Sequence, residues 1–313
     1  MRVGWRDHRG CGQPFAEALI AAGHTVGPIG DVLLIDNDVP FEPYRSFFNV
    51  HDRAFIYPHG GGPLFGCDEW EVDQRTRGQF VIGEGQKQLL EHLGYPRPVK
   101  VVGWPWTPLR PFRPATPERV LFAPMHPDGE GNMSDEWLAV NRDTFDQLVR
   151  LGVRLTVRTV GTPKQSGIPC KEGVFYTQSP GMVGEFRADV VVTAVGTFPS
   201  LAVAQGYPTV VVGQHIRPCD FDPETREERP AVTWERWRHL GWYPFDSVDR
   251  LEDACTKEAS EWRDRFIGSP MTGFAKVFEE AVNEWLPSRS TTSPSPPPQR
   301  GTGTTTGWSS SPG

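Results

Sequence analysis

The sequence predicts an α/β protein made of two Rossmann-like domains, whose parallel sheets face each other across a cleft, followed by a disordered C-terminal tail. Three observations support this prediction. Short apolar runs alternate with segments of helical periodicity, which is typical of parallel sheets wrapped by helices. The alternation stops at a proline-rich stretch and then starts again. Late in the second half, an apolar run, a turn, a short helix and another apolar run have the spacing of a βαβ unit.

The first half is expected to contain five strands and two helices. The helices are predicted near Pro14–Ala22 and from Gly83-Glu84-Gly85 through His92. Apolar runs predict the strands, which are Arg2–Trp5, Val32–Ile35, Ala54–Tyr57, Phe80–Ile82 and Val99–Val102.

The proline-rich segment Trp104–Pro117 is interpreted as a linker that divides the chain. The N-terminal domain is therefore expected over residues 1–108 and the C-terminal domain over residues 109–286. Residues 287–313 are rich in proline, serine, threonine and glycine. Such a segment has too little apolar surface to offset the entropy of ordering, so it is predicted to be disordered.

The second half repeats the pattern. A helix is predicted over Asp135–Leu151, with Ser134 as its N-cap, between strands at Arg119–Ala123 and Val153–Val157. Residues 214–250 carry many charges and several tryptophans, which suggests an irregular insertion or a flap. Helical periodicity then predicts a pair of closing helices over Leu251–Leu286, interrupted at Gly268-Ser269-Pro270.

The most informative segment is residues 187–212. It predicts a strand at Val190–Val192, a turn at Thr193–Ser200, a helix at Leu201–Gln205 and a strand at Thr209–Val212. The turn carries no bulky charge and leads into a helix whose free N–H groups and dipole suit a phosphate. A plain structural crossover is the alternative interpretation.

The composition describes a water-soluble globular protein, with a net charge of −7 and a mean hydropathy of −0.44. No apolar stretch approaches the ~20 residues of a membrane span, and the N-terminus lacks the apolar core of a signal peptide. The five scattered cysteines show no C-x-x-C spacing, which indicates reduced thiols and a cytoplasmic location. No metal site and no cofactor are expected.

Two glycine-containing loops of the first half follow predicted strands. His59 lies just past a strand end, next to Gly60 and Gly61, at the edge where open α/β sheets bind ligands. A neutral imidazole there could accept a proton from an attacking hydroxyl; a loop histidine bonded to backbone is the alternative. Gly10 and Gly12 follow the first strand, where backbone could approach a ligand closely, although two glycines make no nucleotide-binding fingerprint.

In the second half, five residues are candidates for binding a phosphate or diphosphate. His126 and Arg158 each follow a predicted strand, and a guanidinium pairs well with a diphosphate. Gly196, Thr197 and Ser200 surround the helix start, where N–H groups and a hydroxyl could neutralise a leaving diphosphate. Ordinary solvated side chains and helix capping are the competing interpretations.

Three motifs give the chain a resemblance to the GT-B glycosyltransferases, in particular the branch of CDP-glycerol glycerophosphotransferases and teichoic-acid polymerases. The segment 99–105, Val-Lys-Val-Val-Gly-Trp-Pro, resembles that branch's strand before the interdomain linker. The segment 120–126, Val-Leu-Phe-Ala-Pro-Met-His, resembles its first C-domain strand. The segment 188–208 resembles its Ala-Asp-x-x-Ile-Thr-Asp-Tyr-Ser-Ser region, which closes in Gly-x-Pro.

The chain also departs from that pattern. It has Ala194-Val195-Gly196-Thr197 in place of Asp-Tyr-Ser-Ser, and Leu201 in place of the acidic residue in the following helix. The family's Trp-His-Gly-Thr-Pro-Leu-Lys is matched by Pro58-His59-Gly60-Gly61-Gly62-Pro63-Leu64, without the lysine.

The resemblance implies metal-independent transfer of a sugar from a nucleotide-diphosphate donor, as co-substrate, to an acceptor hydroxyl. It gives His59 the role of general base, makes the loop with Gly10 and Gly12 an acceptor contact, and brings His126 near the donor phosphates. A CDP-polyol phosphotransferase, a nucleotide-sugar epimerase and a non-catalytic nucleotide-sugar-binding protein are the alternatives. An epimerase needs cleft carboxylates, for which Glu84 is the candidate in the first half. Cell-wall polymers, small metabolites, proteins and a modified DNA base are all candidate acceptors.

Overall fold

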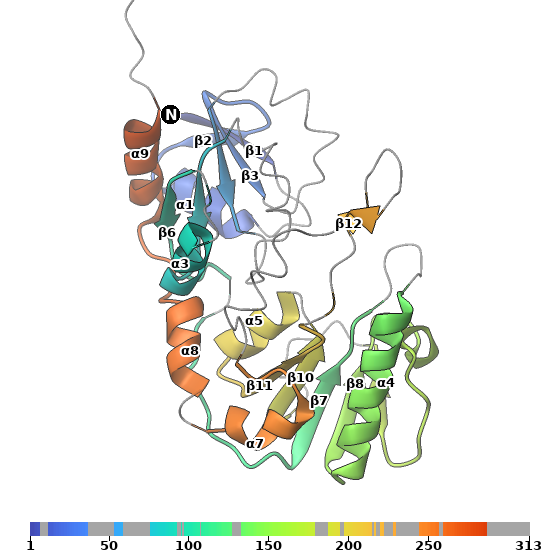
Figure 1. Cartoon of the computed structure of the whole chain (residues 1–313). Helices are drawn as coiled ribbons and strands as arrows, with labels where there is room; N and C mark the ends of the chain where they lie inside the picture. The colour runs from blue at the N-terminus through green and yellow to red at the C-terminus, as the bar shows by residue number, and fades with distance from the viewer. Residues whose placement is uncertain are drawn as a thin grey trace, which may run out of the picture.

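The computed structural model contains two separate parallel β-sheets, one from each half of the chain (Figure 1). It describes residues 1–6, 12–36, 53–58, 76–92, 95, 97–106, 108–126, 133–178, 187–194, 197–214, 216, 220–221, 228–229, 244–256 and 259–286. Two parallel sheets in one chain confirm the predicted fold class. The residue limits of the two domains remain a prediction, and the predicted tail lies outside the described residues.

The first sheet has six strands in the order β2-β1-β3-β4-β5-β6, and every neighbouring pair is parallel. Helix α1 (Gln13–Ala21) connects β1 to β2, and α3 (Glu84–His92) connects β5 to β6. The strands are β1 (Arg2–Arg6), β2 (Thr25–Gly27), β3 (Val32–Asp36), β4 (Ala54–Tyr57), β5 (Thr76–Val81) and β6 (Val99–Val101).

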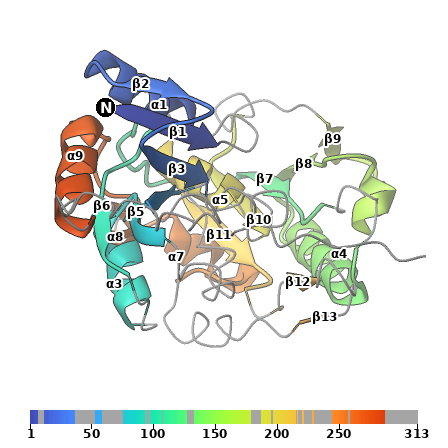
Figure 2. The same cartoon turned by 90° about the horizontal axis from the view of Figure 1, so that it is seen from above.

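Aromatic rings dominate the core of the first sheet, and some of them come from the far end of the chain. Helix α9 (Phe274–Trp285) packs beside α1, as both views of the structure show (Figures 1 and 2). The ring of Phe278 lies 5.6 Å from that of Phe55, and the ring of Phe274 lies 4.9 Å from that of Phe15. The last helix therefore completes the core of the first sheet.

The second sheet has five parallel strands in the order β11-β10-β7-β8-β9. Helix α4 (Asp135–Arg150) connects β7 to β8, and Ser134 caps it as predicted, its Oγ accepting from the Trp137 N–H. Helix α5 (Thr197–Ala204) connects β10 to β11. The strands are β7 (Arg119–Ala123), β8 (Arg154–Arg158), β9 (Phe175–Thr177), β10 (Val190–Ala194) and β11 (Thr209–Val212).

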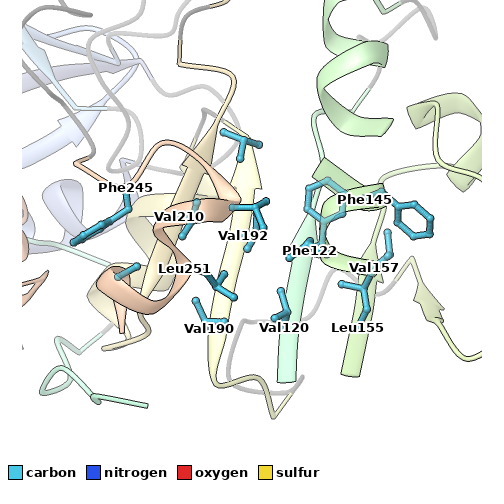
Figure 3. Close-up of a cluster of buried hydrophobic side chains, with 14 of the residues drawn as sticks. Val120, Phe122, Phe145, Leu155, Val157, Val190, Val192, Val210, Phe245 and Leu251 are labelled. Carbon is cyan, nitrogen blue, oxygen red and sulfur yellow. The ribbon is translucent and has the colours of Figure 1, made fainter. Parts of the chain in front are cut away.

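The core of the second sheet is mainly aliphatic (Figure 3). Alternate strand residues such as Val120 and Phe122 point to the face covered by α4 and by α7 (Leu251–Ala254). The intervening residues Leu121 and Val191 pack on the opposite face with Ala202 of α5. Both faces of the central strands are thus buried, as parallel sheets require.

A third cluster of buried side chains joins the two sheets. Ile82, which follows β5, and Trp104 of the linker pack with Val203 of α5 and with Phe266 of α8 (Ala259–Phe266). The Trp104 N–H donates to the Ser269 carbonyl over 2.8 Å, and the two chain segments run in parallel there. The predicted linker therefore lies beside the predicted break of the closing helices.

Several boundaries differ from the prediction. Helix α5 begins at Thr197 instead of Leu201, because Pro199 falls in the first helical turn, where its missing N–H would have no intrahelical partner. The closing helices divide between the sheets: α7 contacts β11, whereas α9 contacts α1 and β5. The remaining elements are the 3₁₀ helices η4 (Pro163–Ser166) and η6 (Val248–Arg250) and the strand pair β12 (Asp220–Phe221) and β13 (Glu228–Arg229).

Candidate functional site

Each sheet has one point where its strand order reverses. In the first sheet the connections from β1 lead to β2 on one side while β3 lies on the other, so the reversal lies between β1 and β3. In the second sheet it lies between β7 and β10. Ligands of open α/β sheets bind outside the carboxyl ends of the strands at such points. The end of the second sheet near α5 is turned toward the first sheet (Figure 1).

Arg158 bridges the reversal point of the second sheet. It is the last residue of β8, and its guanidinium carbon lies 4.7 Å from the ring centroid of Phe198, in the first turn of α5. Because β7 lies between β8 and β10, this half-buried side chain crosses from one side of the reversal point to the other. Burial lowers the pKa of Arg158, but a guanidinium stays charged at neutral pH. The contact therefore holds a positive charge at the carboxyl edge.

The loop after β7 brings His126 to the same edge. His126 is exposed, and its neighbour Met125 is held on both sides of the backbone by the buried amide of Asn141. The Met125 N–H donates to Asn141 Oδ1 over 3.0 Å, and Asn141 Nδ2 donates to the Met125 carbonyl over 3.0 Å. The hydrogen bonds of Asn141 thus fix the position of this loop on helix α4.

The three candidates around the start of α5 have different environments. Thr197 is the first residue of the helix, three positions after Ala194, the last residue of β10. Ser200 is fully buried within the first turns of the helix. Gly196 lies outside the described residues. No acidic side chain occupies the first turn, so the positive end of the helix dipole is uncompensated there by the helix's own residues.

At the edge of the first sheet, Gly12 is required by close packing. It is the N-cap residue of α1, and a Cβ atom on it would lie 2.2 Å from the Tyr57 hydroxyl oxygen and 2.9 Å from Trp5 Nε1. Only glycine therefore fits between the ends of β1 and β4. The other candidates of this edge, Gly10, His59, Gly60 and Gly61, lie outside the described residues.

Other candidates of the first half have local structural partners. Glu84 is exposed at the first residue of α3, with its carboxylate 3.9 Å from the Lys87 ammonium. Trp104 is buried in the cluster between the sheets, and its ring meets that of Trp106 edge to face at 4.9 Å. These two tryptophans therefore pack at the junction of the sheets.

Sequence reasoning did not identify four residues that shape the second edge: Phe198, Asn141, Trp137 and Gly213. Trp137 packs with Ala194 at the end of β10, and its ring fills the space that a Cβ atom on Gly213 would need, 2.3 Å away. Gly213 also has φ of 74°, which favours glycine. One of the four could have been found from the sequence, because Asn141 is an asparagine within the apolar stripe of α4.

Within the described part of the chain, no group of three or more His, Cys, Asp or Glu side chains is placed to hold a metal ion. None of the helices that the structure describes is long and apolar enough to cross a membrane.

Comparison with known proteins found no matching family model and no match among curated proteins. Similar solved structures include the glycosyltransferase SnogD from Streptomyces nogalater, with 15% identity and a TM-score of 0.49 over 90% of this chain and 99% of that one. The lipopolysaccharide outer core galactosyltransferase WaaB has 11% identity and a TM-score of 0.48 over 91% and 100% of the two chains. TarM has 12% identity and a TM-score of 0.42; the match covers 80% of this chain and 54% of TarM.

Proposed function

We propose that the protein is a metal-independent glycosyltransferase that moves a sugar from a nucleotide-diphosphate donor to an acceptor hydroxyl. The observation that carries the proposal is the guanidinium of Arg158, which is held on Phe198 at the reversal point of the second sheet, beside the start of α5. A fixed cation beside a helix N-terminus suits a diphosphate. The motif resemblance to GT-B glycosyltransferases supplies the reaction type.

In this proposal the donor diphosphate lies between Arg158, His126 and the first N–H groups of α5, which begins at Thr197; the preceding residue, Gly196, is a further candidate donor. Negative charge grows on the diphosphate as the bond to the sugar breaks. Donors that are fixed before the reaction stabilise that charge without reorganising, so they favour departure of the nucleotide. Ser200 supports the helix start from inside, because its side chain is buried.

The acceptor would bind at the edge of the first sheet, near Gly10, Gly12, Gly60 and Gly61. His59 would accept the proton of the attacking hydroxyl while oxygen forms its bond to the sugar. A polyol phosphate is the alternative transferred group, and a modified DNA base is one of the candidate acceptors. Closure of the two domains would exclude water and align the reacting atoms.

The first test is a panel of sugars linked to UDP, GDP, ADP, dTDP and CDP, together with CDP-glycerol, scored by thermal shift and by nucleotide release. A donor at 100 times its Kd should add about 2.7 kcal/mol to the free energy of unfolding. Nucleotide release that depends on an acceptor supports transfer, whereas binding without turnover of any donor would indicate a non-catalytic binding protein.

The role of His59 is tested with the donor found in that panel. Replacing His59→Ala should lower transfer by about 10²–10⁴-fold, the usual contribution of general acid–base catalysis, and should leave donor affinity unchanged. Equal loss of transfer and of donor binding would instead make His59 a structural residue.

A further inference from the structure

We propose that Asn141 is a positioning residue for the donor site, which fixes the loops carrying His126 and Arg158 relative to each other. The inference rests on the proposed function, since it assigns both loops to the donor. Asn141 itself lies in the middle of α4, is fully buried, and is not expected to touch a ligand.

The hydrogen bonds of Asn141 reach both loops at once. Its amide forms the two bonds to the Met125 backbone described above, directly before His126. Its Nδ2 also donates to the Ser166 carbonyl over 3.0 Å. Ser166 ends η4, the 3₁₀ helix that follows Arg158 in the connection from β8 to β9. One side chain therefore joins the loop after β7 to the loop after β8.

The second loop is stiffened by its own hydrogen bonds, so a displacement at Ser166 would be passed back toward Arg158. Thr159 Oγ1 donates to the Gly161 carbonyl over 2.8 Å. Thr162 and Gln165 form a capping box at the start of η4, in which each side chain bonds to the other residue's backbone. A short connection with these bonds moves as one piece.

A buried polar side chain at this position lowers the stability of the fold unless it forms hydrogen bonds. The buried stripe of α4 otherwise holds Trp137, Thr144, Phe145 and Leu148. An amide within such a stripe must find partners for both its donor and its acceptor, because a buried unpaired polar group destabilises the fold. Apart from the Met133 sulfur, 3.5 Å from Nδ2, the partners of Asn141 are backbone atoms of the loops at the carboxyl edge, which is the expected arrangement for a residue that orients a site.

The test compares Asn141→Leu with two matched controls in the full chain. Ser166→Ala removes a buried hydroxyl that has no hydrogen-bond partner among the described residues, but keeps the carbonyl that Asn141 uses. Thr144→Val changes another buried polar residue of the same helix stripe. The probes are UDP, GDP, ADP, dTDP and CDP, with inorganic pyrophosphate as a base-free control, and affinity is measured by calorimetry at a temperature where every variant is folded.

We expect Asn141→Leu to weaken binding of the nucleoside diphosphate by about tenfold, the change expected from one lost hydrogen bond to a charged group. Transfer should fall further, by about 100-fold, as for a misplaced catalytic group. Amide hydrogen exchange at Met125 should accelerate in this variant and remain slow in Ser166→Ala and Thr144→Val.

Three results would overturn the inference. Wild-type affinity in Asn141→Leu would do so, as would equal losses of affinity in all three variants, which would show a general loss of stability. If the wild-type protein binds none of these probes, the proposed function fails, and the inference fails with it. If Asn141→Leu does not fold, Asn141→Asp provides the same comparison, because it keeps the acceptor for the Met125 N–H and loses every bond that Nδ2 donates.

Discussion

The two sheets are both parallel, but they obtain their cores from different parts of the chain. The second sheet is covered by side chains from residues 120–255, which follow one another along the sequence (Figure 3). The first sheet uses residues 3–102 and then five buried side chains of the last described segment: Phe274, Phe278, Ala281, Val282 and Leu286. The first sheet therefore depends on residues 274–286, which follow the second sheet in the sequence.

Their carboxyl edges differ as well. At the first edge, the described residues show tight packing of Gly12 against Tyr57 and Trp5. At the second edge, a charged side chain is held over the reversal point, and a buried amide joins two loops. The comparison suggests that the first sheet is organised by long-range packing and the second by local hydrogen bonds at its edge, and four predictions test this difference.

The largest effect is expected from removal of α9. A chain that ends after residue 270 loses the four buried side chains of α9 and that of Leu286, so the first sheet should lose its fold, as measured by circular dichroism and soluble yield. A chain that ends after residue 286 keeps them and should unfold at the wild-type temperature. Wild-type unfolding of the shorter chain would contradict the dependence of the first sheet on α9.

The next effect concerns the packing of the second edge. Gly213→Ala should destabilise the protein more than Gly152→Ala, although both glycines have φ near 70°. The left-handed backbone costs each variant about 1–2 kcal/mol. Only Gly213 also meets the Trp137 ring, which adds about 1–3 kcal/mol of overpacking, whereas a Cβ on Gly152 meets no atom of the described part of the chain within 4 Å. If urea unfolding shows equal losses of stability in the two variants, the Trp137 ring does not restrict the space at Gly213.

A third prediction compares the arginines at the two ends of strand β8. Arg158→Gln should weaken binding of a nucleoside diphosphate by about 1.5–3 kcal/mol, as expected for a hydrogen bond to a charged group. Arg154→Gln changes the same residue type on the same face of β8, at its exposed amino end, and should bind as the wild type does. Titration calorimetry measures both variants. Equal losses of affinity in the two variants would indicate a general effect of charge on binding.

The smallest effect is a pH dependence in the core of the second sheet. Burial raises the pKa of Cys255 to about 11 from an ordinary value of 9.0, and the nearby carboxylates of Asp189 and Glu252 add to the shift. Between these pH values the unfolded thiol ionises while the folded thiol keeps its proton. The stabilising contribution is therefore present below pH 9 and is lost as the pH rises from 9 to 11.

Chemical unfolding at several alkaline pH values checks this dependence. Cys255→Val should show a shallower decline in stability than the wild type. Cys170→Ser, in which the altered thiol is exposed, should follow the wild-type curve. A decline of the same steepness in Cys255→Val would assign the alkaline instability to other groups.

The apolar runs of the sequence were sufficient to predict most of the strands and the two-sheet architecture. Strands β2 and β9 were not predicted, because each has only three residues, the first of them exposed, and so forms no apolar run. The docking of α9 on the first sheet was also missed, since helical periodicity indicates an apolar face but not its partner. For the candidate site, the sequence indicated Arg158 as a strand-end cation. Its contact with Phe198 depends on the strand order, which no local pattern encodes.

The central claim is that a nucleoside diphosphate binds at the carboxyl edge of the second sheet, between Arg158, His126 and the start of α5. The most direct test is a crystal structure of the protein with the nucleoside diphosphate that binds best. The account predicts both phosphates within hydrogen-bond distance of the Arg158 guanidinium and of the first N–H groups of α5. A nucleotide bound at another place, with this edge filled by the protein's own side chains, would contradict it.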